Sequence, residues 1–323
     1  MNEATEPSHR LRVIIVNFRT PELTVDCLRS LADQRPVGAD VRVSVVDNGS
    51  GDDSVRWIQA AVEREGWAGW VEPLPLEKNL GFAAGNNHAI RQDREAFAYL
   101  LLNSDTRVGA GCLSHGLKRM IEEPDIGALS PKAVNEDGSA QAMARRFPTP
   151  IRTVLGALGL PGRLPWLLGW ADVEDASWDR QTTRRDVDWL GGTCLFVRRE
   201  AIDRVGMLDE DFFFYGEDVE FCHRLRRAGY RCHYDPETAV THLGGGSSDP
   251  ERMSQELRNV HRWRARYLVQ RKCYGRWAEA LVKGADLLTS GLRMVFWACL
   301  GQRKGRQYRN ASTVWCWLRG GGV

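Results

Sequence analysis

Carboxylate, imidazole and amide side chains recur in this sequence directly after short apolar runs. Asn103-Ser104-Asp105 follows the run Ala98–Leu102, and His242 ends another run, just before three glycines. A carboxylate oxygen binds hard divalent cations, and a neutral imidazole is a common ligand for manganese. Such a cation offsets the charge that develops on a diphosphate leaving group. The two motifs indicate a site for Mn²⁺ or Mg²⁺ beside a diphosphate, although Asn-Ser-Asp is also ordinary turn chemistry and a single histidine also fits a core.

An acidic pair, Glu217-Asp218, follows the aromatic run Phe212–Tyr215 at the expected start of a helix. One of these carboxylates can accept the proton of an attacking hydroxyl group. The alternative is helix capping, because the helix macrodipole favours acidic side chains at the N-terminus.

Further polar and small residues stand where a ligand would need them. Asp47 ends an apolar run and can accept a hydrogen bond from the N3–H of a pyrimidine. In Asn79–Asn87, small residues open a helix whose N-terminal amides suit phosphate, and Asn86 can bind a sugar or a nucleotide. Trp189, followed by Gly191-Gly192, can form a flat wall against a sugar ring. Each motif also has a purely structural explanation. Asp47 can be a turn residue, the small residues of Asn79–Asn87 can allow close packing of a helix on the sheet, and Trp189 can be a core residue beside a bulge.

The elements expected around these residues form an α/β pattern. Four apolar runs alternate with helical patterns over the first 105 residues: Leu11–Val16, Val41–Val46, Val71–Leu76 and Ala98–Leu102. This alternation predicts a parallel doubly wound sheet, which binds ligands at the carboxyl ends of its strands. The polar groups that begin at Asn17, Asp47 and Asn103 stand at three such ends, so the sheet would bring them together. The sequence contains neither G-x-G-x-x-G after the first strand nor a P-loop, which argues against a dinucleotide oxidoreductase and a P-loop NTPase.

The pattern changes after Ile126. We expect further strands and helices in the following ranges: strands over Ile126–Val134, Val187–Arg198, Arg231–Tyr234 and Thr238–Leu243, and helices over Gly216–Gly229, Arg252–Tyr274 and Trp277–Leu300. Residues 145–186 are irregular, and they hold an apolar stretch, Ile151–Trp170, that glycine and proline interrupt.

Six segments of the sequence resemble one known family. They are VIIVNFRTPELTVDCLRSL, VSVVDNGSGDDS, NLGFAAGNN, LLNSDTRV, DWLGGTCLFVRREAIDRVGMLDEDFFFYGEDVEFCHRLRRAGY and THLGGGSS, over about residues 11–246. Their order is that of family 2 inverting glycosyltransferases with the GT-A fold, a Rossmann-like, mostly parallel sheet with flanking helices. The subgroup that they resemble is the bacterial rhamnosyltransferases of cell-wall and surface-polysaccharide assembly.

The resemblance implies a role for each matching residue. Asp105 would carry the metal in an element similar to D-x-D, whose first position is Asn103 here, and His242 would be the second metal contact. Asp218 matches the position of the catalytic base, with Glu217 supporting it. The donor nucleotide sugar would be held by Asn17, Arg19, Asp47, Asn79, Gly81, Asn86, Asn103 and Ser104, and the acceptor by Trp189, Gly191 and Gly192.

The resemblance implies direct transfer, with inversion, from dTDP-rhamnose to a hydroxyl of a lipid-linked saccharide. A UDP-sugar donor (galactofuranose, GlcNAc or another hexose) would use much the same site. A non-catalytic nucleotide-sugar-binding module is a further alternative, against which Asp105, Asp218 and His242 argue. A nucleotidyltransferase would need a Gly-rich, basic loop after the first strand, which Asn17–Pro21 does not supply.

Composition and charge divide the chain into two regions. The chain has 323 residues, a formal net charge of +2 and 43% hydrophobic residues, values that fit a globular protein and exclude a disordered chain. From Glu251 to the end there are 15 Lys and Arg against 4 Asp and Glu, together with 5 of the 12 Trp. We therefore expect the GT-A domain over residues 1–250 and a basic, Trp-rich helical region over residues 251–323.

The cysteines and the N-terminus predict a reducing compartment. None of the eight cysteines forms a C-x-x-C pair, and the start MNEATEPSHR is polar and acidic, unlike a secretory leader. We expect a cytoplasmic protein, peripheral on the cytoplasmic face of the inner membrane.

An apolar stripe marks the C-terminal region. It consists of Leu281, Ala285, Leu288, Leu292, Val295, Phe296 and Cys299, with arginine, lysine and tryptophan around it. This composition suits a helix in the interface of an anionic membrane, where Ile151–Trp170 would border the lipid. The alternative is packing on the catalytic body or a homodimer contact. The acidic first 250 residues and the lack of a nucleic-acid motif argue against nucleic-acid binding.

Overall fold

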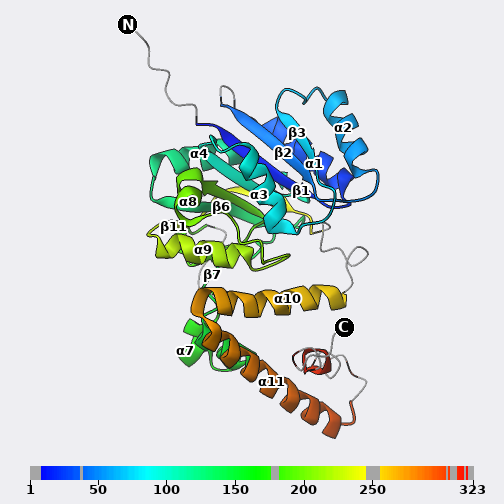
Figure 1. Cartoon of the computed structure of the whole chain (residues 1–323). Helices are drawn as coiled ribbons and strands as arrows, with labels where there is room; N and C mark the ends of the chain where they lie inside the picture. The colour runs from blue at the N-terminus through cyan, green and yellow to red at the C-terminus, as the bar shows by residue number, and fades with distance from the viewer. Residues whose placement is uncertain are drawn as a thin grey trace. The chain divides into compact units, whose positions relative to one another are not determined.

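The structure of the protein is a computed structural model of the whole chain (Figure 1). It describes residues 9–36, 39–175, 182–244, 255–302, 305, 311–315 and 318. The chain divides into two compact units, Met1–Arg145 with Ser177–Ala265, and Arg146–Ala176 with Arg266–Val323. The predicted boundary after residue 250 lies outside the described residues and stays a prediction.

The described part of the first unit contains a nine-stranded mixed sheet. Its order is β3-β2-β1-β4-β10-β6-β11-β5, and β8 pairs with β11 off this path. The strands are β1 (Leu11–Asn17), β2 (Val41–Asp47), β3 (Val71–Pro75), β4 (Ala98–Asn103), β5 (Thr106–Val108), β6 (Ile126–Val134), β8 (Arg185–Val187), β10 (Cys194–Arg198) and β11 (Arg231–His242). A second, two-stranded sheet joins β7 (Ala144–Arg145) to β9 (Trp189–Leu190).

The parallel part of the sheet is formed by the first four apolar runs of the sequence. All seven residues of β1 are buried, and β4 is buried up to its last residue, Asn103. Strands covered on both faces consist of continuous apolar residues rather than alternating ones. β1 pairs in parallel with β2 and β4, and β2 pairs in parallel with β3. The predicted α/β fold with a parallel doubly wound core is confirmed.

Helices cover the sheet of the first unit (Figure 1). They are α1 (Pro21–Gln34), α2 (Ser54–Arg64), α3 (Phe82–Gln92), α4 (Cys112–Glu122), α8 (Arg199–Val205) and α9 (Glu217–Arg227). The first part of α10 (Gln255–Val269) also belongs to this unit. As the sequence predicts, α1 begins at Pro21, where the missing N–H of proline leaves no helical hydrogen bond unmade. It buries Val25, Leu28 and Leu31 against the sheet.

Strand register brings the polar groups at the strand ends together. Asn17 at the end of β1 lies opposite Asp47 at the end of β2, and Val16 lies opposite Asn103 at the end of β4. The predicted convergence of the three polar groups at one edge of the sheet is confirmed.

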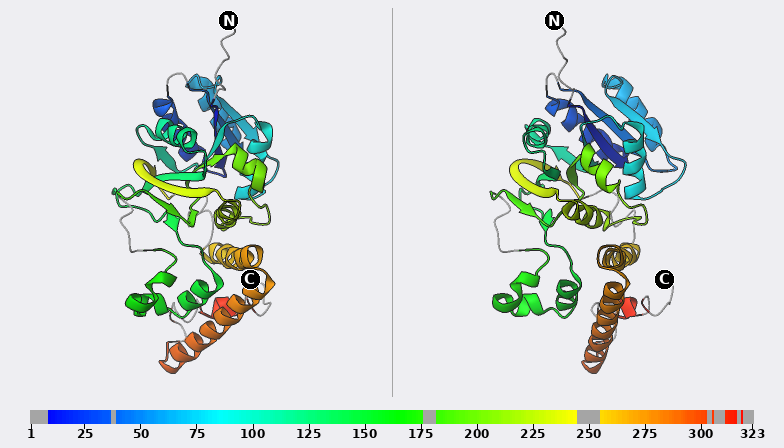
Figure 2. Two further views of the ribbon diagram at one scale, coloured as in Figure 1. Left: turned by 90° about the vertical axis from the view of Figure 1, so that its left-hand side faces the viewer. Right: turned by 60° about the vertical axis from the view of Figure 1, so that its left-hand side comes forward.

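The later strands differ from the sequence prediction. The two short strands expected over 231–243 form one strand, β11, whose register with β6 shifts between Asp235 and Ala239. Pro236 lies at this shift, and its ring nitrogen has no hydrogen to donate to a ladder. Such irregularities bend a strand, and β11 (yellow) is visibly curved in Figure 2. The bend lets the last residues of β11 pair with β5, so that His242 lies opposite Thr106.

The strand expected over Val187–Arg198 is divided into three, namely β8, β9 and β10. Gly191-Gly192 separates β9 from β10, because residues without side chains have little preference for a strand. β9 leaves the main sheet and pairs with β7, while β10 lies antiparallel between β4 and β6.

The described part of the second unit is helical. It contains α5 (Pro150–Ala157), α6 (Leu160–Arg163), α7 (Pro165–Leu168), a 3₁₀ turn η1 (Gly169–Ala171), a π-helical turn η2 (Gln270–Tyr274) and the long α11 (Arg276–Cys299). α5 packs against α11. Residues 146–176 therefore belong with the C-terminal region in space.

Two glycines after β2 provide a matched test of the backbone there. Gly49 and Gly51 have φ angles of +65° and +68°, in the left-handed region. A Cβ atom at Gly49 would lie 2.3 Å from the carbonyl carbon of Lys78, whereas one at Gly51 would meet nothing within 4 Å. We expect Gly51→Ala to lower the free energy of unfolding by about 1–2 kcal/mol, because an alanine in the left-handed region costs about that much. Gly49→Ala should lower it by clearly more, because its Cβ would also clash with the backbone of Lys78. Urea unfolding of both variants measures the difference, and equal losses would contradict the close approach.

Candidate active site

A cavity of about 370 Å³ lies in the first unit at the carboxyl ends of the central strands. Eleven of the predicted site residues line it: Asn79, Gly81, Asn103, Ser104, Asp105, Trp189, Gly191, Gly192, Glu217, Asp218 and His242. The carboxylates at positions 105 and 218, which lie far apart in the sequence, therefore line the same cavity.

The imidazole of His242 lies beside the carboxylate of Asp105. Their Nε2 and Oδ1 atoms are 3.3 Å apart. On the other side of the ring, His242 Nδ1 lies 2.8 Å from Oε1 of Gln141. Gln141 Nε2 donates to Asn135 Oδ1 (2.7 Å) and to the carbonyl oxygen of His242 (3.1 Å), which fixes the orientation of the amide. His242 Nδ1 therefore donates to Gln141, and Nε2 is the ring nitrogen that faces Asp105.

This donor set fits a divalent cation. Nε2 of His242 and Oδ1 of Asp105, 3.3 Å apart, are two atoms that can bind the same cation. An imidazole whose other nitrogen donates to a fixed acceptor is the arrangement that protein metal sites use. Asn103 adds an amide beside the pair, with Nδ2 3.5 Å from His242 Nε2. Gln141 was not predicted from the sequence, because its contact with His242 arises only in the fold.

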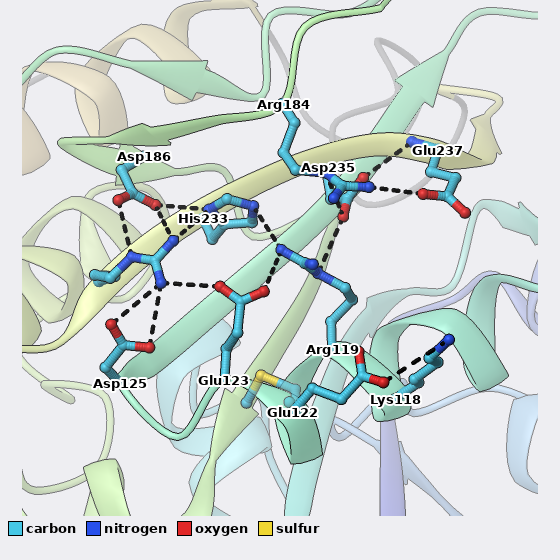
Figure 3. A network of polar contacts seen from close by, with 12 residues as sticks. Lys118, Arg119, Glu122, Glu123, Asp125, Arg184, Asp186, His233, Asp235 and Glu237 are labelled. Atoms are coloured by element: carbon cyan, nitrogen blue, oxygen red, sulfur yellow. Dashed lines mark hydrogen bonds and ion pairs between the residues drawn. The ribbon is translucent and has the colours of Figure 1, made fainter.

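Another group with metal-ligand chemistry lies away from this cavity. Within the described residues, His115, Asp235 and Glu237 are the one group of three such side chains close enough to share an ion. Figure 3 shows the arginines that already pair with its carboxylates: Arg184 Nε and Arg119 Nε lie 3.1 and 3.3 Å from Asp235 Oδ2, and Arg184 Nη2 lies 2.7 Å from Glu237 Oε2. The guanidinium charges offset the acids, so this network is best explained as a structural ion-pair cluster.

A strained turn presents Asp218 to the cavity at the start of α9. Tyr215 and Gly216 both have positive φ angles, +68° and +91°, which reverse the chain before the helix. Asp218 Oδ2 accepts a hydrogen bond from the backbone N–H of Gly192 (3.2 Å), and Oδ1 accepts one from the N–H of Val219 (2.8 Å). The predicted glycine at position 192 thus orients the predicted base.

The two adjacent carboxyls differ in their surroundings. Burial raises the pKa of Glu217 to about 8, and the charge of Asp218 adds to the shift. Glu217 Oε2 is buried and has no hydrogen-bond partner among the described residues. Burial also raises the pKa of Asp218, but the two backbone N–H groups and the charge of Arg145 oppose the rise. Glu217 therefore keeps its proton at neutral pH, whereas Asp218, with a backbone N–H donor on each carboxylate oxygen, is the carboxyl placed to act as a base.

Four predicted nucleotide-binding residues do not line the cavity, namely Asn17, Arg19, Asp47 and Asn86. Asn17 Nδ2 donates to Asp47 Oδ1 (2.6 Å), and Ser50 donates to Asp47 through both its Oγ (2.6 Å) and its N–H (3.1 Å). Arg19, at φ +57°, donates from its N–H to Ser50 Oγ (2.9 Å). The predicted contacts of these residues with a nucleoside stay predictions.

Asn86 lies on the buried face of α3. Its Nδ2 donates to the carbonyl oxygen of Phe82 (2.9 Å), and its Oδ1 is buried without a partner among the residues that the structure describes. Its predicted sugar or nucleotide contact is likewise untested.

Asn48 lines the cavity although it was not among the predicted residues. Its Nδ2 donates to Asn79 Oδ1 and to the carbonyl oxygen of Gly81, both at 3.0 Å, and its Oδ1 accepts from the N–H of Leu80 at 3.0 Å. It therefore joins the turn after β2 to the loop before α3. Its place in the Asp-Asn-Gly turn was the signal that could have identified it.

The predicted acceptor wall has a cation beside it, Arg145. Trp189 is buried, and the guanidinium of Arg145 lies 5.3 Å from the centre of its ring. Arg145 also lines the cavity. Gly191 packs on Met143, because a Cβ there would lie 2.8 Å from the methionine methyl group.

An aromatic loop, Phe213–Tyr215, forms another part of the cavity wall. The N–H of Phe82 donates to the carbonyl oxygen of Phe213 (2.9 Å). From α10, the ring of His261 stacks on Phe213 at 5.3 Å, and the guanidinium of Arg262 lies 5.3 Å from the ring centre of Tyr215. The aromatic run in the sequence was a signal for this loop, but its partners on α10 were not.

Residues 9–265 match the family model described as glycosyltransferase like family 2. The chain belongs to glycosyltransferase family 2. This family-2 chain is 35% identical over 225 residues to an N-acetylglucosaminyl-diphospho-decaprenol L-rhamnosyltransferase from Mycobacterium tuberculosis, covering 66% of this chain and 68% of that protein. It is 26% identical over 220 residues to a low-salt glycan biosynthesis hexosyltransferase from Haloferax volcanii, covering 67% of this chain and 62% of that protein.

The fold of the family-2 chain is similar to that of a solved mannosyltransferase from Pyrobaculum calidifontis in complex with GDP-Man and Mn²⁺. The TM-score is 0.56 at 16% identity, over 98% of this chain and 88% of that chain. The predicted family, its similarity to rhamnosyltransferases and the GT-A fold are confirmed, and the chain is a glycosyltransferase.

The raised pKa of Glu217 predicts a pH-dependent stability. The folded protein keeps a proton on Glu217 that the unfolded chain releases above about pH 4.5, so this residue makes stability fall as pH rises from there to about 8. Glu217→Gln removes the ionisable group. We expect its melting temperature to rise relative to the parent protein by a few degrees more at pH 8 than at pH 5.

Glu210→Gln is the matched control. Hydrogen bonds from Asn87 and Arg91 lower the pKa of Glu210, so its stabilising contribution is present at neutral pH and is lost in acid. We expect this variant to be less stable than the parent at pH 7 and to approach it as the pH falls. Differential scanning fluorimetry over the pH range measures both, and a pH-independent effect of Glu217→Gln would contradict the protonated state of Glu217.

Proposed function

We propose that this glycosyltransferase moves L-rhamnose from dTDP-rhamnose, with inversion, onto a hydroxyl of a lipid-linked saccharide in cell-wall or surface-polysaccharide synthesis. One observation carries the proposal: Asp218 lines the same cavity as the Asp105–His242 pair. A base and a site for the charge of a diphosphate are the two things that a direct displacement from a nucleotide sugar needs. The name of the relative from Mycobacterium tuberculosis, which contains both L-rhamnosyltransferase and a decaprenol diphosphate, supports the choice of donor sugar and acceptor.

In the proposed reaction Asp218 accepts the proton of the acceptor hydroxyl. The hydroxyl oxygen attacks the anomeric carbon from the face opposite the nucleotide, and the bond from that carbon to the diphosphate oxygen breaks. The N–H groups of Gly192 and Val219 orient the carboxylate of Asp218 and favour its ionised form. Glu217 stays neutral, so it does not repel the developing negative charge of the leaving group.

Asp105 and His242 are the proposed ligands of the divalent cation, Mn²⁺ or Mg²⁺, and Gln141 holds the imidazole in the required tautomer. When bound, such a cation supplies positive charge for the leaving nucleoside diphosphate. Asn103 stands where D-x-D elements have their first acid, so the charge of the site depends on Asp105.

The remaining predicted contacts belong to the same proposal. Trp189, Gly191 and Gly192 would form the acceptor wall, with Arg145 available to an anionic group such as a diphosphate. Asn79, Gly81, Asn103 and Ser104 would contact the donor from the cavity wall, and Asn17, Arg19, Asp47 and Asn86 would also hold the nucleotide sugar.

A UDP-sugar donor is the alternative within the enzyme class. A thermal-shift panel of dTDP-rhamnose, UDP-galactofuranose and UDP-GlcNAc, with and without Mn²⁺, distinguishes the donors, because the ligand that binds most tightly gives the largest shift. Tight binding without turnover on any acceptor would instead favour a non-catalytic module.

The proposal includes a peripheral position on the cytoplasmic face of the inner membrane, where a lipid-linked acceptor would be met. No described helix is long and apolar enough to cross a membrane.

Removing the base separates binding from transfer. We expect Asp218→Asn to lower transfer at least about a hundredfold, since general bases contribute roughly 10²–10⁴-fold, while dTDP binding changes little. Radiolabelled sugar transfer and calorimetric titration with dTDP measure the two properties. Asp203→Asn is the control, because Asp203 is exposed on α8, pairs with Arg199 and lies outside the cavity. Full activity of Asp218→Asn would remove Asp218 from the role of base.

Two clusters with metal-ligand chemistry allow a direct comparison. We expect Asp105→Asn and His242→Ala each to weaken the Mn²⁺-dependent part of dTDP binding by about tenfold or more, because each removes one protein ligand. His115→Ala, in the group of His115 with Asp235 and Glu237, should leave that part unchanged. Calorimetric titrations with Mn²⁺ and with a chelator measure the effect. Loss of Mn²⁺ dependence in His115→Ala alone would move the metal site to the other cluster.

A further inference from the structure

The long helix α11 is amphipathic in an unusual sense, because the face that it buries is polar and small. Its buried residues are Ala278, Val282, Asp286, Thr289 and Ser290. Its exposed large apolar side chains are Trp277, Leu281, Leu288, Leu292, Val295 and Phe296, and Leu300 follows directly after the helix. A helix of a water-soluble protein normally does the reverse and turns its apolar stripe toward the core.

The buried polar face is held by specific bonds, so the orientation of the helix is well determined. Asp286 accepts hydrogen bonds from Arg266 Nε (2.9 Å) and Nη2 (3.1 Å) and from the hydroxyl of Tyr267 (3.0 Å). Arg293 donates to the carbonyl oxygen of Ala157 (2.7 Å), at the end of α5. Rotating α11 to bury its leucines would leave these polar groups without partners, which is costly.

A second set of exposed apolar side chains lies on α5, which packs on α11, and on the short elements that follow α5 in the same unit. It consists of Ile151, Leu158, Trp166, Leu167 and Trp170, in the stretch from α5 to η1. Trp166 is 81% exposed and Trp277 is 90% exposed. Of the 17 exposed large hydrophobic side chains in the described residues, 12 belong to the second unit. Concentrations of this kind mark surfaces that bind a partner.

The charge of this region indicates which partner. Residues 266–323 contain eleven Lys and Arg against two Asp and Glu. Both acids are already paired, Asp286 with Arg266 and Glu279 with Lys283 at 2.6 Å. A second copy of this chain meeting the same surface across a two-fold axis would bring like charges together. An anionic lipid surface, in contrast, offers an apolar interior to the leucines and tryptophans and negative headgroups to the arginines and lysines.

We propose that the exposed face of α11 and the stretch Ile151–Trp170 form one docking surface for an anionic lipid membrane. We call it the lipid-docking surface; its members are the exposed apolar residues of the second unit. Tryptophans suit the interface because the ring is apolar and the N–H can reach water. The proposal deepens the proposed function and rests on it only for the link to a lipid-linked acceptor, since binding to lipid is a property of the surface itself.

Vesicle flotation of the full chain tests this surface. The vesicles are phosphatidylcholine containing phosphatidylglycerol, with pure phosphatidylcholine as the comparison. We expect binding to the anionic vesicles that weakens in high salt, and at least about tenfold weaker binding of the double variant Leu288→Ser, Leu292→Ser, since two exposed apolar side chains are lost. Trp57→Ser is the matched control, because Trp57 is also exposed but lies on α2 in the first unit.

A second variant tests the contribution of exposed basic residues in the same unit. We expect Arg271→Gln, Lys272→Gln to weaken binding to anionic vesicles by about tenfold or more and to leave binding to phosphatidylcholine unchanged. Both side chains are exposed, so melting temperatures should match the parent protein.

Three outcomes would overturn the proposal. The first is no flotation of the parent protein with anionic vesicles. The second is equal flotation of the leucine variant and the Trp57→Ser control. The third is a dimer in light scattering that the leucine variant converts to a monomer, which would make the surface a protein interface.

Transfer to a short-chain, water-soluble acceptor keeps this test separate from the proposed function. We expect the leucine variant to retain that activity while it loses transfer to acceptor in vesicles. Flotation without transfer from any donor would overturn the proposed function and leave the lipid-docking surface intact.

Discussion

The side chain of Asn17 holds together the carboxyl ends of the central strands, beside the cavity. It is buried at the carboxyl end of β1, donates to Asp47 on β2, and accepts from the hydroxyl groups of Thr20 (3.0 Å) and Thr24 (2.9 Å) on the way into α1. Thr20 in turn lies 3.2 Å from the hydroxyl of Ser104, beyond the end of β4. Buried polar groups must be satisfied, and here they satisfy one another across three strand ends. Without this network the register would still align the strands, but the loops that form the cavity floor would lack fixed positions.

The site above this network uses the low dielectric of the interior in two ways. At positions 217 and 218, burial raises the pKa of both adjacent carboxyls, and the N–H groups of Gly192 and Val219 and the charge of Arg145 oppose the rise at Asp218. At the other side of the cavity, the Gln141 amide accepts from Nδ1 of His242 and so orients Nε2 toward Asp105. Both effects come from neighbours contributed by other elements, so the chemistry of each residue is set by the fold around it.

The second unit differs from the first in where its polar and apolar side chains lie. Its interior is held by Arg266, Tyr267 and Asp286, while its outer surface is apolar. The exposed tryptophans and the excess of positive charge are the properties on which the proposed lipid-docking surface rests.

The sequence alone determined the parallel core of the sheet, because continuous apolar runs and intervening helical patterns are local properties of the chain. The strand pattern also determined that the polar groups at the strand ends converge, because parallel strands end at the same edge of a sheet. The acidic pair at the start of α9 was identified from its place after the aromatic run. Tertiary structure alone decided that Gln141 and Asn48 join the site, and that Asn17 and Asp47 bind each other behind it. It also decided that β11 bends toward Asp105 and that residues 146–176 pack with the C-terminal helices. The physical reason is that these features depend on contacts between residues distant in the sequence, where burial and hydrogen-bond satisfaction, rather than local pattern, select the partner.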